Sequence, residues 1–173
     1  FRQIPIDEPD ATRGRAILAK FAGAHRRRTV PPAAIAAIDR LHRRYATYSA
    51  YPGRPLRFLD NLIRDGEPRT SIPEAEVYSA FTRETGLPVP LVDPAVPLDV
   101  NAVRDWFGSR VIGQPEAVDL VTDLLATVKA GLTRPNRPLA SLPVVGPTGG
   151  GKTGVAEAVA GVLFGSAARP TRV

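Results

Sequence analysis

The sequence has no cysteine and no methionine, and aromatic residues make up only 6% of its 173 residues. Without cysteine there are no disulfides, thiolate zinc sites or cysteine nucleophiles, and this composition leads us to expect a cytoplasmic protein. There is no run of about 18 apolar residues, so we expect no transmembrane helix and no membrane partner. A natural gene product begins with Met, whereas this chain begins with Phe1, so we expect a fragment of a longer protein.

Positive charge is in excess, with 23 Lys and Arg against 17 Asp and Glu and a formal net charge of +6. Such a charge favours acidic partners, nucleic acid among them. The dense clusters are limited to Arg26–Arg28 and Arg40–Arg44, and the few aromatic residues are not interleaved with them as a base-stacking platform requires. We therefore expect a solvated basic face or a contact with an acidic partner subunit, and we do not expect nucleic-acid binding.

Apolar spacing predicts a mainly helical chain. Ile35, Ile38 and Leu41 recur every third residue and form one stripe on a helix. Asp10 and Asp99 precede apolar-periodic segments and are expected to cap helices. The predicted helices span residues 10–24, 33–48, 55–64, 71–85, 99–107, 114–130 and 152–164.

Two segments between these helices predict other structure. Leu87–Pro97 holds four prolines and is expected to be an extended linker. Leu142–Val145 is a short apolar run typical of a buried strand. Polar residues with Gly and Pro at 65–70 favour a domain boundary. We thus expect a small helical domain over residues 1–65, a linker with a short helix over 66–97, and the beginning of an α/β P-loop domain over 98–173.

One motif carries recognisable chemistry. Residues 146–153 match the G-x-x-x-x-G-K-[ST] pattern, with an apolar run before them and an Ala-rich helix after them. The glycines let successive N–H groups point at phosphate oxygens, Lys152 would reach the β- and γ-phosphates, and the Thr153 hydroxyl would bind Mg²⁺. ATP and Mg²⁺ are therefore the expected cofactors, and a glycine-rich turn that fits the pattern by chance is the alternative. The expected phosphate-binding residues are Gly146, Pro147, Thr148, Gly149, Gly150, Gly151, Lys152 and Thr153.

Hydrolysis needs a second apolar strand that ends in Asp-Glu. The nearest match is Leu56–Asp60, but Arg57 interrupts it and the segment has a helical pattern. After the loop the remaining carboxylate is Glu157, on the helix that follows. We therefore assign no catalytic residue, and expect that this segment alone does not turn over ATP.

From about Ile72 onward the chain resembles the Clp family of AAA+ protein unfoldases and disaggregases. Four motifs in the family's order carry the resemblance: Thr85–Val89, Arg110–Ala117, Ala130–Pro138 and Val145–Thr153. Residues 1–65 are more weakly similar to the helical lid of the family's first ATPase module. The resemblance implies that the chain spans the end of the first module and the start of the second.

The resemblance also implies further site residues. Val111 and Ile112 fall in the box that wraps the adenine in this family, and the alternative is that both are core residues. Arg54 falls where the family has a lysine near the first nucleotide, so it could touch a phosphate. Its alternative role is that of a capping or solvated arginine.

Two departures from the family pattern bear on function. Gly150 stands where the family has Val, which loosens the loop without blocking a phosphate contact. No long coiled-coil insertion follows the lid, which favours an unfoldase with a protease partner over a standard disaggregase.

Three hypotheses follow for the intact protein. The first is an ATPase that threads protein substrates through a homo-oligomeric ring, expected to be a hexamer. The second is a truncated or degenerate homologue that binds nucleotide or partner subunits without hydrolysis. The third is a P-loop motor acting on nucleic acid.

Overall fold

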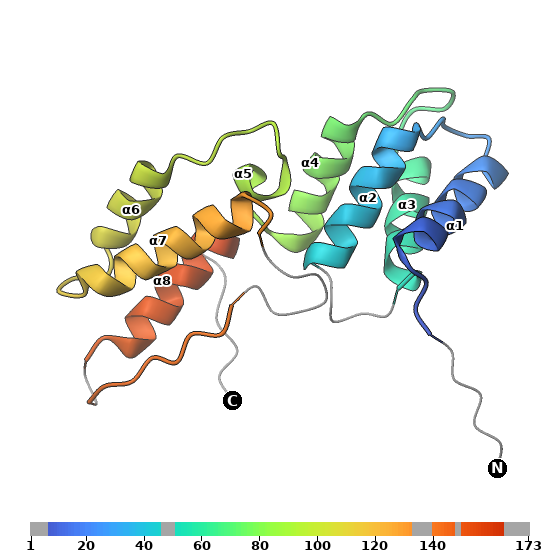
Figure 1. Ribbon diagram of the computed structural model, residues 1–173. Coiled ribbons are helices and arrows are strands. Elements are labelled where there is room, and N and C mark those ends of the chain that lie inside the picture. Colours follow the sequence, from blue (N-terminus) through green and yellow to red (C-terminus); the bar gives the residue numbers. More distant parts are fainter. Residues whose placement is uncertain (1–6, 46–50, 133–139, 148–149, 165–173) are drawn as a thin grey trace, which may run out of the picture. The chain divides into compact units, whose positions relative to one another are not determined.

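The computed structural model describes residues 7–45, 51–132, 140–147 and 150–164. These residues form helices and irregular segments that divide into two compact units, and the division falls between Ala80 and Phe81, inside α4. The prediction of a mainly helical chain is confirmed (Figure 1). None of the helices in the described part is long and apolar enough to cross a membrane. The three-part division at residues 65 and 97 stays a prediction.

The first unit is a bundle of helices in which α1 packs against α2 and α3, and α2 packs against α3 (Figure 1). The apolar stripe predicted on α2 is confirmed, because Ile35, Ile38 and Leu41 are all buried. Each fully buried aliphatic side chain contributes about 1.5–3 kcal/mol to folding. The elements are α1 (Ala11–Ala24), α2 (Pro32–Tyr45), α3 (Gly53–Asp65) and the first part of α4 (Glu74–Thr85), whose last turn belongs to the second unit.

The predicted cap of α1 is confirmed. The Asp10 carboxylate accepts a hydrogen bond of 2.8 Å from the Arg13 backbone N–H. This bond satisfies one of the free donors at the helix N-terminus and lowers the pKa of Asp10 below its ordinary value.

A buried carboxylate ties the start of α1 to α2. Asp39 accepts hydrogen bonds of 2.8 Å from Arg43 Nε and from the Tyr51 hydroxyl. Arg43 also donates to the Pro9 and Asp10 carbonyls at 2.9 Å. Burial, together with the hydrogen bond to Asp39, raises the pKa of Tyr51 above its ordinary value. The arginine cluster at 40–44 is therefore partly internal rather than a solvated patch.

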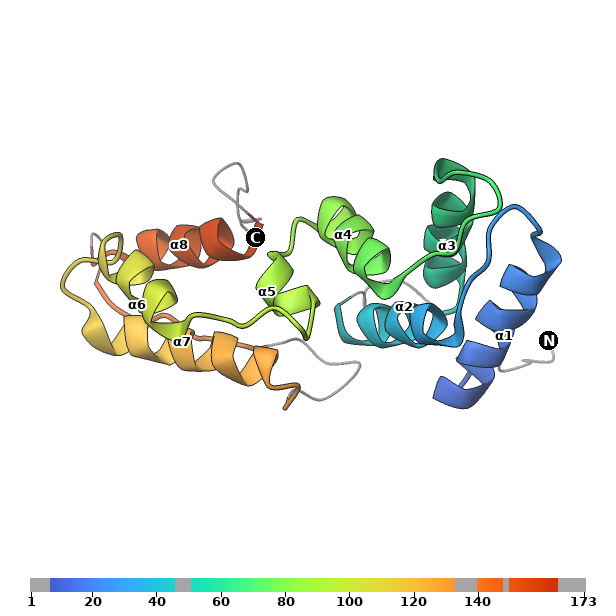
Figure 2. The same cartoon turned by 90° about the horizontal axis from the view of Figure 1, so that it is seen from above.

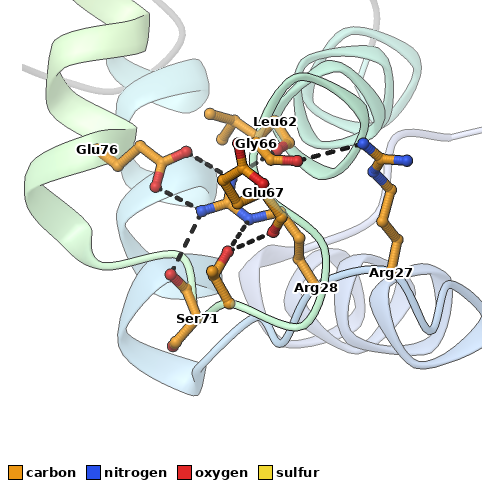
Figure 3. Close-up of polar contacts among 8 residues, drawn as sticks. Arg27, Arg28, Leu62, Gly66, Glu67, Ser71 and Glu76 are labelled. Carbon is orange, nitrogen blue, oxygen red and sulfur yellow. Dashed lines mark hydrogen bonds and ion pairs between the residues drawn. The ribbon is translucent and has the colours of Figure 1, made fainter.

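A buried arginine, Arg28, joins the α1–α2 and α3–α4 connections (Figure 3). Arg28 is 7% exposed, and its guanidinium contacts the Glu76 carboxylate at 2.6 and 2.7 Å. It also donates to Thr70 Oγ1 and to the Leu62 carbonyl, both at 2.9 Å. Beside it the two connections run in parallel, with Thr29 bridged to Ser71. One residue of the predicted basic cluster thus has a structural role.

The second unit is built around α7, which packs against α5 and α6 (Figure 2). Its buried side chains include Phe107 of α6 and Val121, Leu125 and Val128 of α7. The predicted cap of α6 is confirmed, because Asp99 accepts a 3.0 Å hydrogen bond from the Ala102 N–H. The elements are α5 (Val89–Val92), α6 (Val100–Gly108), α7 (Pro115–Lys129) and α8 (Lys152–Phe164).

The prediction of an extended linker over Leu87–Pro97 is wrong in part. Residues 89–92 form the short helix α5, and its Leu91 and Val92 are buried. A proline in the first turn of a helix loses no hydrogen bond, so Pro90 is compatible with this helix. The turn after it is held by Lys129, whose ammonium donates to the Asp93 carbonyl at 2.7 Å and the Val96 carbonyl at 2.5 Å.

The prediction of a buried strand at Leu142–Val145 is also wrong for this chain. The segment is irregular, and Val144 and Val145 are 47% and 92% exposed. A buried parallel strand belongs to a sheet, in which it pairs with a neighbouring strand and both faces are covered. Apart from the isolated Thr29–Ser71 bridge, the described residues offer no strand to pair with.

Candidate functional site

The predicted phosphate loop leads directly into α8. Gly146 and Pro147 are exposed, and the Gly150 N–H donates to the Pro147 carbonyl at 3.2 Å. The Val155 N–H then donates to the Gly151 carbonyl at 3.1 Å, which starts the helix. The predictions for Thr148 and Gly149 lie outside the described residues.

Gly151 has a backbone conformation that requires glycine. Its φ is +80°, in the left-handed region that other residues rarely adopt. A Cβ atom at this position would meet nothing within 4 Å, so the dihedral angle and not the available space demands glycine. At Gly150 the reason is closer contact, because a Cβ there would lie 3.2 Å from the Pro147 carbonyl oxygen. These two residues turn the chain so that the N-terminus of α8 follows at once.

Lys152 is the first residue of α8, and its side chain folds back onto the loop. The ammonium donates to the carbonyl oxygens of Gly146 and Pro147, each at 2.7 Å. The charge is thus held at the loop by two acceptors, which it would have to exchange for phosphate oxygens on binding a nucleotide.

Thr153 is exposed at the second position of α8. Here the free N–H groups and the positive end of the helix dipole favour an anion. Among the described residues, no group of three or more His, Asp or Glu side chains is placed to hold a metal ion. A Mg²⁺ ion at Thr153 would therefore depend on phosphate oxygens and water for its other ligands.

The segment after α6 carries the predicted adenine contacts. Its start is fixed to the helix, because the N–H groups of Arg110 and Val111 donate to the Phe107 carbonyl at 2.9 and 2.8 Å. Val111 is 8% exposed, whereas Ile112 is 87% exposed, so the two side chains have different surroundings. Gly113 follows with a φ of +76°, which turns the chain into α7.

Val111 lines an open hollow of about 460 Å³ between the end of α6 and the start of α7. One edge carries the ion pair between Arg104 Nε and Asp119 Oδ1 at 3.0 Å. No described residue of the phosphate loop lines the hollow. Its lining residues are Arg104, Asp105, Gly108, Val111, Gly113, Gln114, Pro115, Val118 and Asp119.

Arg54 lies in the first turn of α3, where it is half-buried. It belongs to the first unit, whereas the phosphate loop and Val111 belong to the second. By the resemblance, the predicted contact of Arg54 concerns the nucleotide of the first module, and it stays a prediction.

Sequence reasoning missed a contact between α6 and α8. The chain's single tryptophan, Trp106, packs against Gly161 in the helix that follows the phosphate loop. A glycine in the middle of a predicted helix was the available signal, because such a glycine often marks close packing.

No family model matches the chain. It is 37% identical over 105 residues to the chaperone protein ClpB of Vibrio cholerae and 41% identical over 103 residues to that of Enterococcus faecalis. These matches cover 61% and 60% of this chain and 12% of each relative. ClpB of Staphylococcus epidermidis is 35% identical over 118 residues, which are 67% of this chain and 14% of that protein.

The structure is similar to that of Hsp104 in a closed-state cryo-EM reconstruction with ATPγS and FITC-casein. The TM-score is 0.64 at 26% identity, and the match covers 95% of this chain and 30% of that one. The resemblance to the Clp family is therefore confirmed: homologues of this chain are ClpB chaperones. The chain spans 12–14% of the length of the curated relatives described above.

Proposed function

We propose that this homologue of ClpB chaperones supplies an ATP-binding loop to a Clp-type AAA+ ATPase. The observation that carries the proposal is the junction at Gly151 and Lys152. A glycine at φ +80° ends the loop, and the next residue places a lysine ammonium at the N-terminus of α8. A loop of this kind followed by a helix N-terminus suits a phosphate chain.

Each loop residue has a distinct role in this proposal. Lys152 would transfer its ammonium from the loop carbonyls to the β- and γ-phosphates of ATP. The Thr153 hydroxyl would be one ligand of Mg²⁺, which would partly neutralise the phosphates when bound. Backbone N–H groups from Gly150 to Thr153 would donate to phosphate oxygens.

The base would lie against the segment that follows α6. Val111 supplies an apolar wall to the hollow there, and apolar side chains suit the flat face of adenine. Ile112 is free to close over a ligand, since its side chain is 87% exposed. By the same resemblance, Arg54 would contact a second nucleotide at the first unit.

For the intact protein we propose ATP-driven threading of protein substrates through a homo-oligomeric ring, with six subunits as the expected number. The support is the likeness to ClpB chaperones and to Hsp104, whose reconstruction contains ATPγS and FITC-casein. Hydrolysis would need a strand that ends in Asp-Glu, which this sequence does not show after the loop, and an arginine, which we expect from a neighbouring subunit. A protease partner remains a hypothesis based on the missing coiled-coil insertion.

Titration of the 173-residue chain with a fluorescent ATP analogue, in parent and Lys152→Ala forms, tests the loop. We expect the variant to bind about 10–100-fold more weakly, because a hydrogen bond to a charged group is worth about 1.5–3 kcal/mol. Lys20→Ala is the matched control, since Lys20 is an exposed lysine of α1 in the first unit. Equal affinity of the Lys152→Ala and parent chains would refute the assignment.

The net charge of +6 favours one further candidate, a motor acting on nucleic acid. For the intact protein, ATPase stimulation by casein supports the protein-threading function. Stimulation by DNA, with binding that weakens steeply as salt rises, supports the nucleic-acid motor instead.

A further inference from the structure

The edge of the Trp106 ring touches α8 at Gly161. A Cβ atom at position 161 would lie 3.1 Å from Trp106 Cη2 and 3.7 Å from Cζ2. At 3.1 Å the Trp106 ring or α8 would have to give by a few tenths of an ångström, so glycine favours the close approach of α8 to α6 at this point (Figure 2). The small buried residues Ala158 and Ala160 lie on the same helix. Gly161 is therefore the residue of α8 that the Trp106 ring contacts.

The Trp106 ring is braced from its other sides. The Arg110 guanidinium carbon lies 3.8 Å from the ring centre, and Arg110 Nη1 donates to the Trp106 carbonyl at 3.3 Å. The buried Phe107 ring stands edge-on to it, with ring centres 5.3 Å apart and planes at 88°. The ring would lose these contacts by swinging away, so a larger residue at 161 would displace α8 instead.

The two helices that meet here carry the two parts of the candidate nucleotide site. α6 is joined through the turn at Phe107 to Val111, which lines the hollow. α8 begins at Lys152, about 13 Å along the helix from Gly161 at 1.5 Å per residue. A shift or tilt of α8 at Gly161 is therefore transmitted to the phosphate loop, while the 111–113 segment stays with α6.

The geometry points to Trp106 as a positioning residue that, seated on Gly161, sets the distance between the base-contacting segment 111–113 and the phosphate loop. This inference rests on the proposed function, since it concerns the same nucleotide. If the Trp106–Gly161 contact is disturbed, binding weakens for a ligand that must contact both the segment 111–113 and the phosphate loop. A ligand that needs only the phosphate loop is unaffected.

The test compares ATP with inorganic tripolyphosphate by isothermal titration into the 173-residue chain. Gly161→Leu is expected to weaken ATP binding by about tenfold, which corresponds to about 1.4 kcal/mol, and to leave tripolyphosphate binding within about twofold. Phenylalanine lacks the part of the tryptophan ring that contacts position 161. The double variant Trp106→Phe with Gly161→Leu is therefore expected to recover most of the ATP affinity. Ala156→Leu, an exposed position on the same helix, is the matched control and should leave both affinities unchanged.

Four results would overturn the inference: unchanged ATP affinity in Gly161→Leu, equal weakening of both ligands, an effect of equal size in Ala156→Leu, or no rescue by Trp106→Phe. If Gly161→Leu does not fold, Trp106→Ala removes the contact without adding bulk and must lower the ATP affinity relative to tripolyphosphate. Lys152→Ala separates the two levels of the proposal. If Lys152→Ala loses both ligands but Gly161→Leu shows no selective effect on ATP, the positioning role is refuted and the nucleotide site stands. If the parent chain binds neither ligand, both the positioning role and the proposed nucleotide site are refuted.

Discussion

Replacing Arg28 by alanine is expected to destabilise the first unit strongly, although arginines of an exposed basic run usually tolerate substitution. Arg28 is 7% exposed, and its guanidinium has partners on three sides: Glu76, Thr70 and the Leu62 carbonyl (Figure 3). It therefore joins α3, α4 and the connection between them to the segment after α1. Hydrogen bonds to Glu76 also raise the pKa of Arg28 above its ordinary value, so the guanidinium keeps its charge.

The loss in the free energy of unfolding follows from the groups that lose a partner in the alanine variant. Breaking a fully buried ion pair costs about 3–5 kcal/mol, but the Glu76 side chain is 32% exposed and can be rehydrated, so its share is smaller. The Leu62 carbonyl loses a donor in a buried setting, which costs about 1–3 kcal/mol. We expect a loss of about 2–4 kcal/mol in the free energy of unfolding, a large part of the 5–15 kcal/mol typical of a domain.

Urea unfolding followed by circular dichroism measures this loss. Arg27→Ala is the matched control, because Arg27 is exposed and its side chain donates a long 3.4 Å bond to the Gly66 carbonyl. We expect the control to change stability by about 0.5 kcal/mol or less. Tryptophan fluorescence from Trp106 reports the second unit separately and should be unchanged by either variant at low urea. Equal, small effects of Arg27→Ala and Arg28→Ala would refute the structural role of Arg28.

Two further predictions concern a buried phenol and a helix cap. Burial and the hydrogen bond to Asp39 raise the pKa of Tyr51, so the folded chain holds this proton more tightly than the unfolded chain does. The contribution of Tyr51 to the free energy of unfolding should therefore be level below pH about 10 and fall above it by up to about 1.4 kcal/mol per pH unit, and Tyr51→Phe should reduce this slope in alkaline urea titrations. Asp99→Ala should lower the stability of the second unit by about 1 kcal/mol in thermal unfolding, whereas Asp99→Asn, which can still cap α6, should change it little.

Much of the helical framework could be predicted from the sequence, because local signals determine it. The Asp10 and Asp99 caps and the stripe on α2 depend on residues within one or two turns of each other. The linker prediction failed at α5 because proline content alone does not show that Leu91 and Val92 are buried by another helix. Such burial depends on contacts distant in the sequence, which local patterns do not contain.

The candidate site shows the same limit. The glycine required at position 151 and the placement of Lys152 at the start of a helix follow from a local motif, and the structure has both. The internal role of Arg28 could not be predicted, since its partners lie 34 or more residues away. The contact of Arg43 with Asp39 is a local i, i+4 pair, but its bonds to the Pro9 and Asp10 carbonyls are distant in the sequence. The Trp106–Gly161 contact joins helices whose sequence positions differ by 55 residues, and periodicity gives no sign of it.

The Trp106–Gly161 contact is more important because the segment before the phosphate loop is exposed. In the described residues Val145 is 92% exposed and no strand lies beside it, so the loop is not fixed from its N-terminal side by a sheet. What fixes it is α8, through the turn at Gly151 and through the packing of Gly161 on Trp106. A loop held from one side transmits any tilt of that helix to its phosphate-binding groups. Pairing of residues 142–145 with a strand would add a second support, and the effect of Gly161→Leu on ATP affinity should then become smaller. The size of that effect thus measures how far the loop in this chain depends on α8 alone.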